Sequence, residues 1–275
     1  MSSSLAPFLL PDGYGRPPLA ALLREGSVVT EVGRLAVARG TGRRTRRRTP
    51  YIARAAVRSA EPVLLIPGFL AGDWTLKAMS GELRARGFRT YRAHIHANVG
   101  CTLNAATLIE TGLERIAERR GSRVQVVGHS LGGMIARGIA VRRPDLVSGI
   151  VTMGSPMLAP AAHHAVLTRG VDLLTTLSRI GLKGVMSDDC VSGSCAELSF
   201  TESQQAVPDQ VAMTNVYSKR DGIVDWRACI DPSGRHVEVR ASHIGMALDP
   251  RVIDVVHASL LQQSETAAVE VGATA

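Results

Sequence analysis

The sequence predicts an α/β protein with a mostly parallel β-sheet, helices on both faces of the sheet, and a small inserted cap. First, apolar runs of strand length alternate with helical patterns from residue 61 to about residue 263, which is typical of a parallel sheet. Second, the run Val63-Leu64-Leu65-Ile66 is continuously apolar, as expected for a strand buried on both faces. Third, 45% of the 275 residues are hydrophobic and 20% are charged, so the chain can form a sizeable core and is not disordered throughout.

Each element of this alternation follows from a local pattern. The expected strands are residues 63–66, 89–95, 124–127, 146–153, 212–217 and 236–239, and the expected helices are residues 73–86, 103–120, 131–142 and 250–261. Asn104 is a candidate N-cap for the second of these helices, and Gly121 is a candidate stop. Residues 264–275 are small and polar, and we expect a flexible tail there.

Two segments fall outside the alternation. Residues 1–60 are predicted to be a separate helical and Arg-rich segment, in which Pro17 and Pro18 open a helix. Residues 155–208 are predicted to be a cap inserted into the 61–263 domain, with an amphipathic helix from Val166 to Ile180 and a polar loop over residues 184–195. The insertion would either line the site as a mobile cap or simply cover the sheet.

The formal net charge of +8 comes from one segment of the chain. Nine arginines lie from Arg34 to Arg58 without an acidic residue among them, and the rest of the chain has 23 basic and 24 acidic residues. Few aromatic residues accompany these arginines, so no specific nucleic-acid partner is expected. The run from Arg43 to Arg48 is interpreted as a solvated loop or as a weak, salt-sensitive contact with an anionic membrane surface.

The four cysteines do not form a disulfide scaffold, and no Cys-x-x-Cys pair indicates a zinc or redox site. We therefore expect neither a metal nor another cofactor. Cys190 and Cys195 could close a short loop, whereas Cys101 and Cys229 have no obvious partner. The N-terminus lacks an uninterrupted apolar core, and the longest uncharged stretch, residues 146–168, contains prolines and histidines. No signal peptide or membrane span is therefore expected, and a cytoplasmic location follows as an expectation.

The strongest motif is Gly128-His129-Ser130-Leu131-Gly132, which lies between a predicted strand and a predicted helix. A Gly-x-Ser-x-Gly motif indicates a reactive serine in this context, because a sharp strand-to-helix turn exposes the serine hydroxyl. Glycines two residues on either side of Ser130 remove side chains that would collide across the turn. The dipole of the following helix favours negative charge near Ser130. The sequence therefore predicts a nucleophilic serine.

A serine nucleophile needs a base and an orienting carboxylate, in the chain order serine, acid, histidine. Asp221 follows the strand at residues 212–217, and His243 follows the strand at residues 236–239, so these two residues are the predicted acid and base. Asp225 is the competing carboxylate, which we rank below Asp221 because Asp221 follows its strand directly. His129 is expected to pack under the helix, and the remaining six histidines are expected to be pocket-lining or structural.

Acyl transfer also needs hydrogen-bond donors for an oxyanion. One predicted donor is the backbone amide of Leu131, immediately after the nucleophile. The second is the backbone amide of Phe69, because Gly68 lets the loop after the first strand approach the serine closely. Pro67-Gly68 alone would be only a strand-ending turn.

Together these motifs resemble the α/β-hydrolase superfamily over about residues 61–262. The resemblance is greatest to its bacterial lipases and esterases, including the branch similar to GPI-inositol deacylases. It implies a cofactor-independent ester hydrolase with the triad Ser130, Asp221 and His243, acting on a small-molecule or lipid ester. Many relatives have a histidine where this chain has Pro67, but that histidine is not a triad member.

Four alternatives to an ester hydrolase stay open. An amidase, a thioesterase or an acyltransferase would use the same triad, and a non-catalytic binding protein could share the fold. The sequence leaves acyl length, the alcohol group and oligomeric state undetermined.

Overall fold

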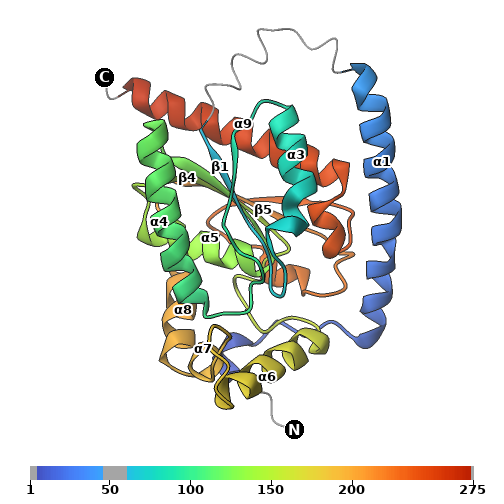
Figure 1. The fold of residues 1–275 in the computed structure, drawn as a ribbon, viewed down its shortest axis with the longest axis vertical. Coiled ribbons are helices and arrows are strands. Elements are labelled where there is room, and N and C mark those ends of the chain that lie inside the picture. Colours follow the sequence, from blue (N-terminus) through green and yellow to red (C-terminus); the bar gives the residue numbers. More distant parts are fainter. Residues whose placement is uncertain (1–4, 46–60, 274–275) are drawn as a thin grey trace.

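The computed structural model describes residues 5–45 and 61–273, and its centre is a six-stranded sheet in which all neighbouring strands are parallel (Figure 1). The strands are β1 (Val63–Ile66), β2 (Thr90–Arg92), β3 (Val124–His129), β4 (Val147–Met153), β5 (Ala212–Tyr217) and β6 (Arg235–Glu238). Their order across the sheet is β2-β1-β3-β4-β5-β6. The predicted α/β class with a parallel sheet is confirmed.

Helices cover both faces of the sheet because alternate residues of each strand point to opposite sides. Val63 and Leu65 of β1 pack with α3 (Lys77–Ala85) and α9 (Pro250–Ala273) in one apolar cluster. Leu64 and Ile66 pack with α4 (Thr102–Arg120) and α5 (Leu131–Arg142) in a second cluster on the other face. The central strands β3 and β4 are buried along their whole length, so both clusters depend on them.

Several element boundaries differ from the sequence-based predictions. Helix α4 begins at Thr102 with Cys101 at the N-cap position, so Asn104 is not the cap, whereas Gly121 ends the helix in the left-handed conformation with φ 63° as expected. Strand β2 has only three residues. Helix α9 continues to Ala273, well beyond the expected end at residue 261, because the glutamine, glutamate and alanine residues after Leu261 favour helix.

The predicted cap contains three helices, which lie together at one end of the molecule in Figure 1. They are α6 (Ala165–Arg179), α7 (Asp189–Ser192) and α8 (Ser194–Gln204). The amphipathic pattern predicted α6 almost to the residue. The stretch at residues 184–195 was expected to be a loop, and it contains α7 and the start of α8 instead. Its Gly and Ser residues have low helix propensity, so propensity alone predicts a loop there.

The described part of the N-terminal segment packs against the main domain and shares its core. After the short 3₁₀ helix η1 (Pro7–Leu9), it comprises the 3₁₀ helix η2 (Leu19–Ser27) and helix α1 (Val28–Thr45), which runs along one side of the molecule (Figure 1). Leu35 of α1 is buried in the cluster beneath α3 and α9. Arg34 Nη2 donates to Asp249 Oδ2 at 2.8 Å. The segment is therefore not a separate unit.

The arginine run has only a partial structural description. Helix α1 includes the backbone of Arg43 and Arg44, so these two residues are helical and do not lie in the expected loop. Residues 46–48 lie outside the described residues, and the predicted membrane contact stays a prediction. Among the described residues, no helix is both long enough and apolar enough to cross a membrane.

Candidate active site

Ser130 occupies a strained turn between β3 and α5. Its backbone has φ 53° and ψ −123°, a conformation that costs free energy for a residue with a Cβ. The two motif glycines allow the turn: a Cβ on Gly128 would lie 2.4 Å from the carbonyl oxygen of Gly132, and a Cβ on Gly132 would lie 2.2 Å from that of Ile66. Side chains cannot occupy that space, so the local sequence accounts for the turn.

Asp221 and His243 come together in the loops that follow β5 and β6. Because both strands are parallel, their carboxyl ends meet at one edge of the sheet. His243 Nδ1–H donates to Asp221 Oδ2 at 2.7 Å, and both residues are buried. Asp221 Oδ1 accepts from the backbone amides of Ile223 and Val224 at 2.8 and 2.7 Å, which fixes the carboxylate. The Nδ1–H bond leaves Nε2 of the neutral ring as an acceptor.

Asp225, the competing carboxylate, lies in a different environment. Its Oδ1 accepts from the backbone amide of Arg227 at 3.1 Å, and its Oδ2 accepts from Arg227 Nη2 at 2.7 Å and from the amide of Gly15 at 3.1 Å. Asp225 therefore caps the 3₁₀ helix η5 (Trp226–Cys229) and pairs with an arginine. The structure brings Asp221, and not Asp225, to the ring of His243.

The pKa of His243 is raised above its ordinary value. Burial by itself lowers this pKa, but the charge of Asp221, the hydrogen bond to Asp221 and the charge of Glu25 together outweigh burial. The neighbouring His129 shows the opposite effect: burial, followed by the charge of His243, lowers its pKa to about 3. His129 is therefore neutral, and only His243 gains a proton readily.

Two buried carboxylates from the N-terminal segment bind the backbone of the loops that carry Asp221 and His243. Glu25 Oε1 accepts from the amides of Gly222 and His243, both at 2.9 Å, and Glu25 Oε2 accepts from the amide of Ile244 at 3.0 Å. Glu31 accepts from the amide and the hydroxyl of Ser242 at 2.8 and 2.6 Å. The N-terminal segment thus fixes the position of His243 directly.

His129 supports the same loop from the opposite side. Its Nε2–H donates to the backbone carbonyl of His243 at 2.9 Å, and the centroids of the two rings lie 4.9 Å apart. The sequence-based expectation that His129 packs under the helix is therefore wrong. Its ring reaches across to the loop that follows β6, since the turn at Ser130 directs the preceding side chain toward that loop.

The loop expected to supply an oxyanion donor lies against the serine turn. A Cβ on Gly68 would be 3.0 Å from Ser130 Cβ, so a side chain there would press on the serine. The buried Asn98 fixes this loop: its Nδ2 donates to the carbonyl of Pro67 at 3.0 Å, and its own carbonyl accepts from the amide of Leu70 at 3.0 Å. Leu131 is the first residue of α5, where backbone amides have no acceptor within the helix.

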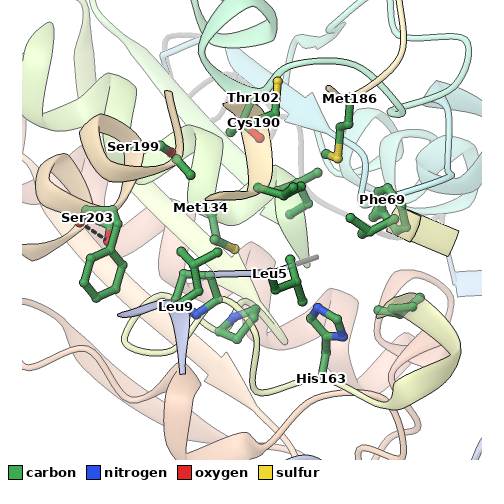
Figure 2. A pocket seen from close by; sticks show the side chains of 18 of the residues that line it. Leu5, Leu9, Phe69, Thr102, Met134, His163, Met186, Cys190, Ser199 and Ser203 are labelled. Carbon is green, nitrogen blue, oxygen red and sulfur yellow. Dashed lines mark hydrogen bonds between the residues drawn. The ribbon is translucent and has the colours of Figure 1, made fainter. Parts of the chain in front are cut away.

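Two cavities meet at Ser130. The first is bounded largely by apolar side chains: Leu5 and Leu9 of the N-terminal segment, Val171 and Phe200 of the cap, and Met134 of α5 (Figure 2). The second is bounded by the loop after β1 and the loop after β6, including Leu70, Trp74, His243, Ile244 and Leu248. Ser130, Phe69 and Leu167 line both cavities. A bound molecule could therefore extend in two directions from the serine hydroxyl.

Four of the remaining histidines line a cavity or fix local backbone structure. His163 is buried and lines the first cavity, and burial is the main cause of its pKa of about 4. His164 Nδ1 accepts from the amide of Val166 at the start of α6, and its own amide donates to the carbonyl of Ile223 at 2.6 Å. The cap is thereby attached to the Asp221 loop. His94 and His96 line a separate surface cavity.

Sequence reasoning missed Glu25, Glu31 and Asn98. A buried carboxyl group and an exposed one look alike in a sequence, so the two glutamates gave no sign of their role. The available signal was indirect. Gly222 and Gly245 flank Asp221 and His243 in their loops, and a Cβ on them would lie 2.3 Å from the carbonyl of Ala21 and 1.7 Å from Glu31 Oε2. Both glycines are needed because the N-terminal segment packs there.

The parallel sheet, its two helical layers and the strained serine between β3 and α5 are those of the α/β-hydrolase fold. Residues 90–214 match the family described as the PGAP1-like alpha/beta domain, which agrees with the resemblance drawn from the motifs. This region contains the serine turn and the cap but ends before Asp221. No curated protein gives a significant match.

Solved structures share the fold at low sequence identity. The mature form of Bacillus licheniformis lipase BlEst2 has a TM-score of 0.59 and 11% identity, over 74% of this chain and 92% of that chain. Paleococcus ferrophilus monoacylglycerol lipase has a TM-score of 0.51 and 17% identity, over 75% and 96%. The thioesterase domain from the curacin biosynthetic pathway has a TM-score of 0.50 and 16% identity, over 74% and 92%.

Proposed function

We propose that this protein is a serine hydrolase of carboxylic esters with apolar groups, acting through an acyl-enzyme on Ser130. The observation that carries the proposal is the Asp221–His243 pair, bonded at 2.7 Å, whose histidine lines the same cavity as Ser130. A serine in a strained strand-to-helix turn, together with a carboxylate-oriented histidine, is the arrangement that activates a hydroxyl for acyl transfer.

In the first half of the reaction, Ser130 Oγ attacks the ester carbonyl carbon and its proton passes to His243 Nε2. The buried Asp221 carboxylate orients the ring through Nδ1–H and stabilises the imidazolium that forms. The backbone amides of Phe69 and Leu131 donate to the oxyanion of the tetrahedral intermediate. His243 Nε2–H then protonates the alcohol oxygen, the C–O bond of the ester breaks, and the acyl group stays on Ser130.

In the second half, water replaces the alcohol. His243 Nε2 takes a proton from water as its oxygen attacks the acyl carbon, and the proton returns to Ser130 Oγ as the acid leaves. Because His243 must reach the leaving oxygen, the second cavity, which His243 lines, is assigned to the alcohol side. The first cavity is then assigned to the acyl chain, consistent with its apolar walls.

The test is a panel of p-nitrophenyl esters of graded acyl length, hydrolysed by the wild type and by Ser130→Ala. We expect hydrolysis by the wild type and a loss on the order of 10⁶-fold in kcat for Ser130→Ala. A chelator should leave the rate unchanged, since His243 carries the protons. Equal rates for the two proteins would contradict the proposal. Matched thioester and anilide substrates in the same panel separate the thioesterase and amidase alternatives, which share the acyl-enzyme.

A further inference from the structure

Three of the four cysteines form a cluster between the cap and the main domain. Cys101 is the N-cap residue of α4, Cys190 lies in α7, and Cys195 lies in α8. Their sulfur atoms all lie within 4.8 Å of one another, and Cys101 Sγ is 3.2 Å from Cys195 Sγ. All three cysteines are free thiols. The sequence offered no partner for Cys101 and left open whether Cys190 and Cys195 close a short loop, so this arrangement is new information from the structure.

The cluster can be reached by small molecules from two sides. All three cysteines are partly exposed and line the surface cavity that also contains His94 and His96. Cys190 and Cys195 also line the first cavity, where Ser130 lies, and Figure 2 shows Cys190 in its wall. The thiols therefore stand in the wall between the surface and the cavity assigned to the substrate. Cys229, by contrast, is buried, and burial raises the pKa of its thiol well above the ordinary value.

The environment of Cys101 favours its thiolate. Burial by itself raises the pKa of this thiol, but hydrogen bonds from the backbone amide of Asn104 and from the thiols of Cys195 and Cys190 lower the pKa overall. The amides at the N-terminus of α4 favour negative charge for the same reason that helix N-termini bind anions. Burial and the neighbouring Cys101 raise the pKa of Cys195 to about 12. The position of Cys101 at the N-terminus of α4 therefore favours this thiol for the first attack on a disulfide.

We propose that Cys101 and Cys195 form a reversible disulfide that joins the cap to the main domain beside the first cavity. The Cys101 thiolate attacks one sulfur of a small disulfide, such as oxidised glutathione, and releases one thiolate. Cys195, as its proton leaves to solvent, then attacks Cys101 Sγ, forms the protein disulfide, and releases the second thiolate. One small disulfide is reduced to two thiols for each protein disulfide formed.

The geometry favours a disulfide over a metal site. Two thiolates bound tetrahedrally to one zinc ion at about 2.3 Å would lie about 3.8 Å apart, farther than the 3.2 Å between Cys101 and Cys195. A structural zinc site needs four ligands, and among the described residues the cluster supplies three. A disulfide requires the two sulfurs to approach to about 2.0 Å, a short movement of two side chains.

Trypsin separates a linkage through Cys101 from a linkage between Cys190 and Cys195, and single Cys→Ser variants then show which partner Cys101 uses. Cys101 lies on the peptide of residues 93–115, whereas Cys190 and Cys195 share the peptide of residues 184–219. We expect protein equilibrated with oxidised glutathione, alkylated and digested, to give a cross-link between these two peptides that reduction removes. Cys190→Ser should keep the cross-link. Cys195→Ser should form it at least tenfold more slowly, and Cys229→Ser is the matched control that should behave as the wild type.

A thermal shift adds a readout that does not depend on catalysis. Since the disulfide would join residues 94 positions apart, the oxidised protein should melt on the order of 5 °C or more above the reduced protein, and Cys101→Ser should abolish the difference. A link confined to the 184–219 peptide, or thiols that stay free under oxidised glutathione, would overturn the proposal. Stoichiometric zinc that protects all three thiols in native mass spectrometry would also overturn it. None of these outcomes bears on ester hydrolysis.

Discussion

Glu25 accepts a hydrogen bond from the backbone N–H of His243 at 2.9 Å, although the two residues lie 218 positions apart in the chain. Glu25 and Glu31 also accept hydrogen bonds from the backbone amides on either side of His243, whose ring donates to Asp221. A segment that carries no recognisable motif is therefore part of the proposed active site. Its carboxylates act on His243 by position and by charge, and these two effects can be separated.

We expect Glu25→Gln to shift the pH dependence of ester hydrolysis. The proposed base works in its neutral form, so kcat/KM rises with pH through the pKa of His243. The charge of Glu25 contributes to raising that pKa, and removing the charge should move the acidic limb to lower pH. The glutamine side chain also lacks the negative charge that strengthens the hydrogen bonds from the loop backbone to Glu25. We therefore expect kcat at the pH optimum to fall by roughly tenfold.

The control for this change is Glu118→Gln, which alters an exposed glutamate on α4 and should leave the pH profile unchanged. A purely structural role for Glu25 would lower the amount of folded enzyme or its rate at every pH without moving the inflection. An unshifted acidic limb in Glu25→Gln would therefore contradict the electrostatic part of the argument.

The two candidate carboxylates can be distinguished by matched substitutions. Asp221→Asn should lower turnover by about 10⁴-fold, because the amide no longer stabilises the imidazolium or the required tautomer of His243. Asp225→Asn should be mild for catalysis, since Asp225 pairs with Arg227 and Gly15. Initial rates of hydrolysis of one soluble short-chain ester measure the effect of each substitution. If Asp225→Asn were the more damaging change, Asp221 would not be the acid.

The sequence predicted those parts of the site that depend on local structure. The Ser130 turn follows from two glycines and the pattern of strand and helix, and Asp221 and His243 follow from parallel strands that end at one edge of the sheet. Contacts between segments far apart in the chain produce no comparable pattern in the sequence. The hydrogen bonds from Gly222 and His243 to Glu25 could not be inferred, because neither periodicity nor composition records which surface a helix covers.

Gly154 is a further position where a small change should disable the site. It follows β4 with φ 57°, and a Cβ there would lie 3.0 Å from His243 Nδ1 and 3.2 Å from Asp221 Oδ2. We expect Gly154→Ala to displace the pair and to lower kcat on the order of 100-fold. Gly112→Ala, on an open part of α4, is the matched control and should retain full activity. Comparable rates for the two variants would show that the Asp221–His243 geometry tolerates the methyl group.

The buried ion pair between Arg137 and Asp231 should matter for stability more than for chemistry. Arg137 on α5 is 2% exposed and also donates to the carbonyl of Gln205 at 2.8 Å, at the end of the cap. Arg137→Met leaves the buried Asp231 unpaired and should lower the free energy of unfolding by about 3–5 kcal/mol. Urea denaturation measures this loss. The double change Arg137→Met with Asp231→Asn should recover part of it, because no unpaired charge remains.

The assignment of the acyl chain to the first cavity predicts a change in chain-length preference. Met134 lies on α5, four residues after Ser130, and its side chain borders this cavity (Figure 2). Met134→Phe puts a bulkier, more rigid side chain there. It should lower kcat/KM for an octanoate ester about tenfold relative to an acetate ester, since the loss of a few methylene contacts has this magnitude.

The matched control for this change is Leu108→Phe, which adds a phenyl ring at an exposed position of α4 and should leave the octanoate-to-acetate ratio unchanged. A general loss of folded enzyme would lower the hydrolysis rates of both esters equally. The octanoate-to-acetate ratio therefore reports only the effect on the cavity. If Met134→Phe changed the preference for the alcohol group instead of the acyl group, the two cavities would exchange roles. His243 would then have to reach the leaving oxygen from the other side of Ser130, which conflicts with its place in the wall of the second cavity.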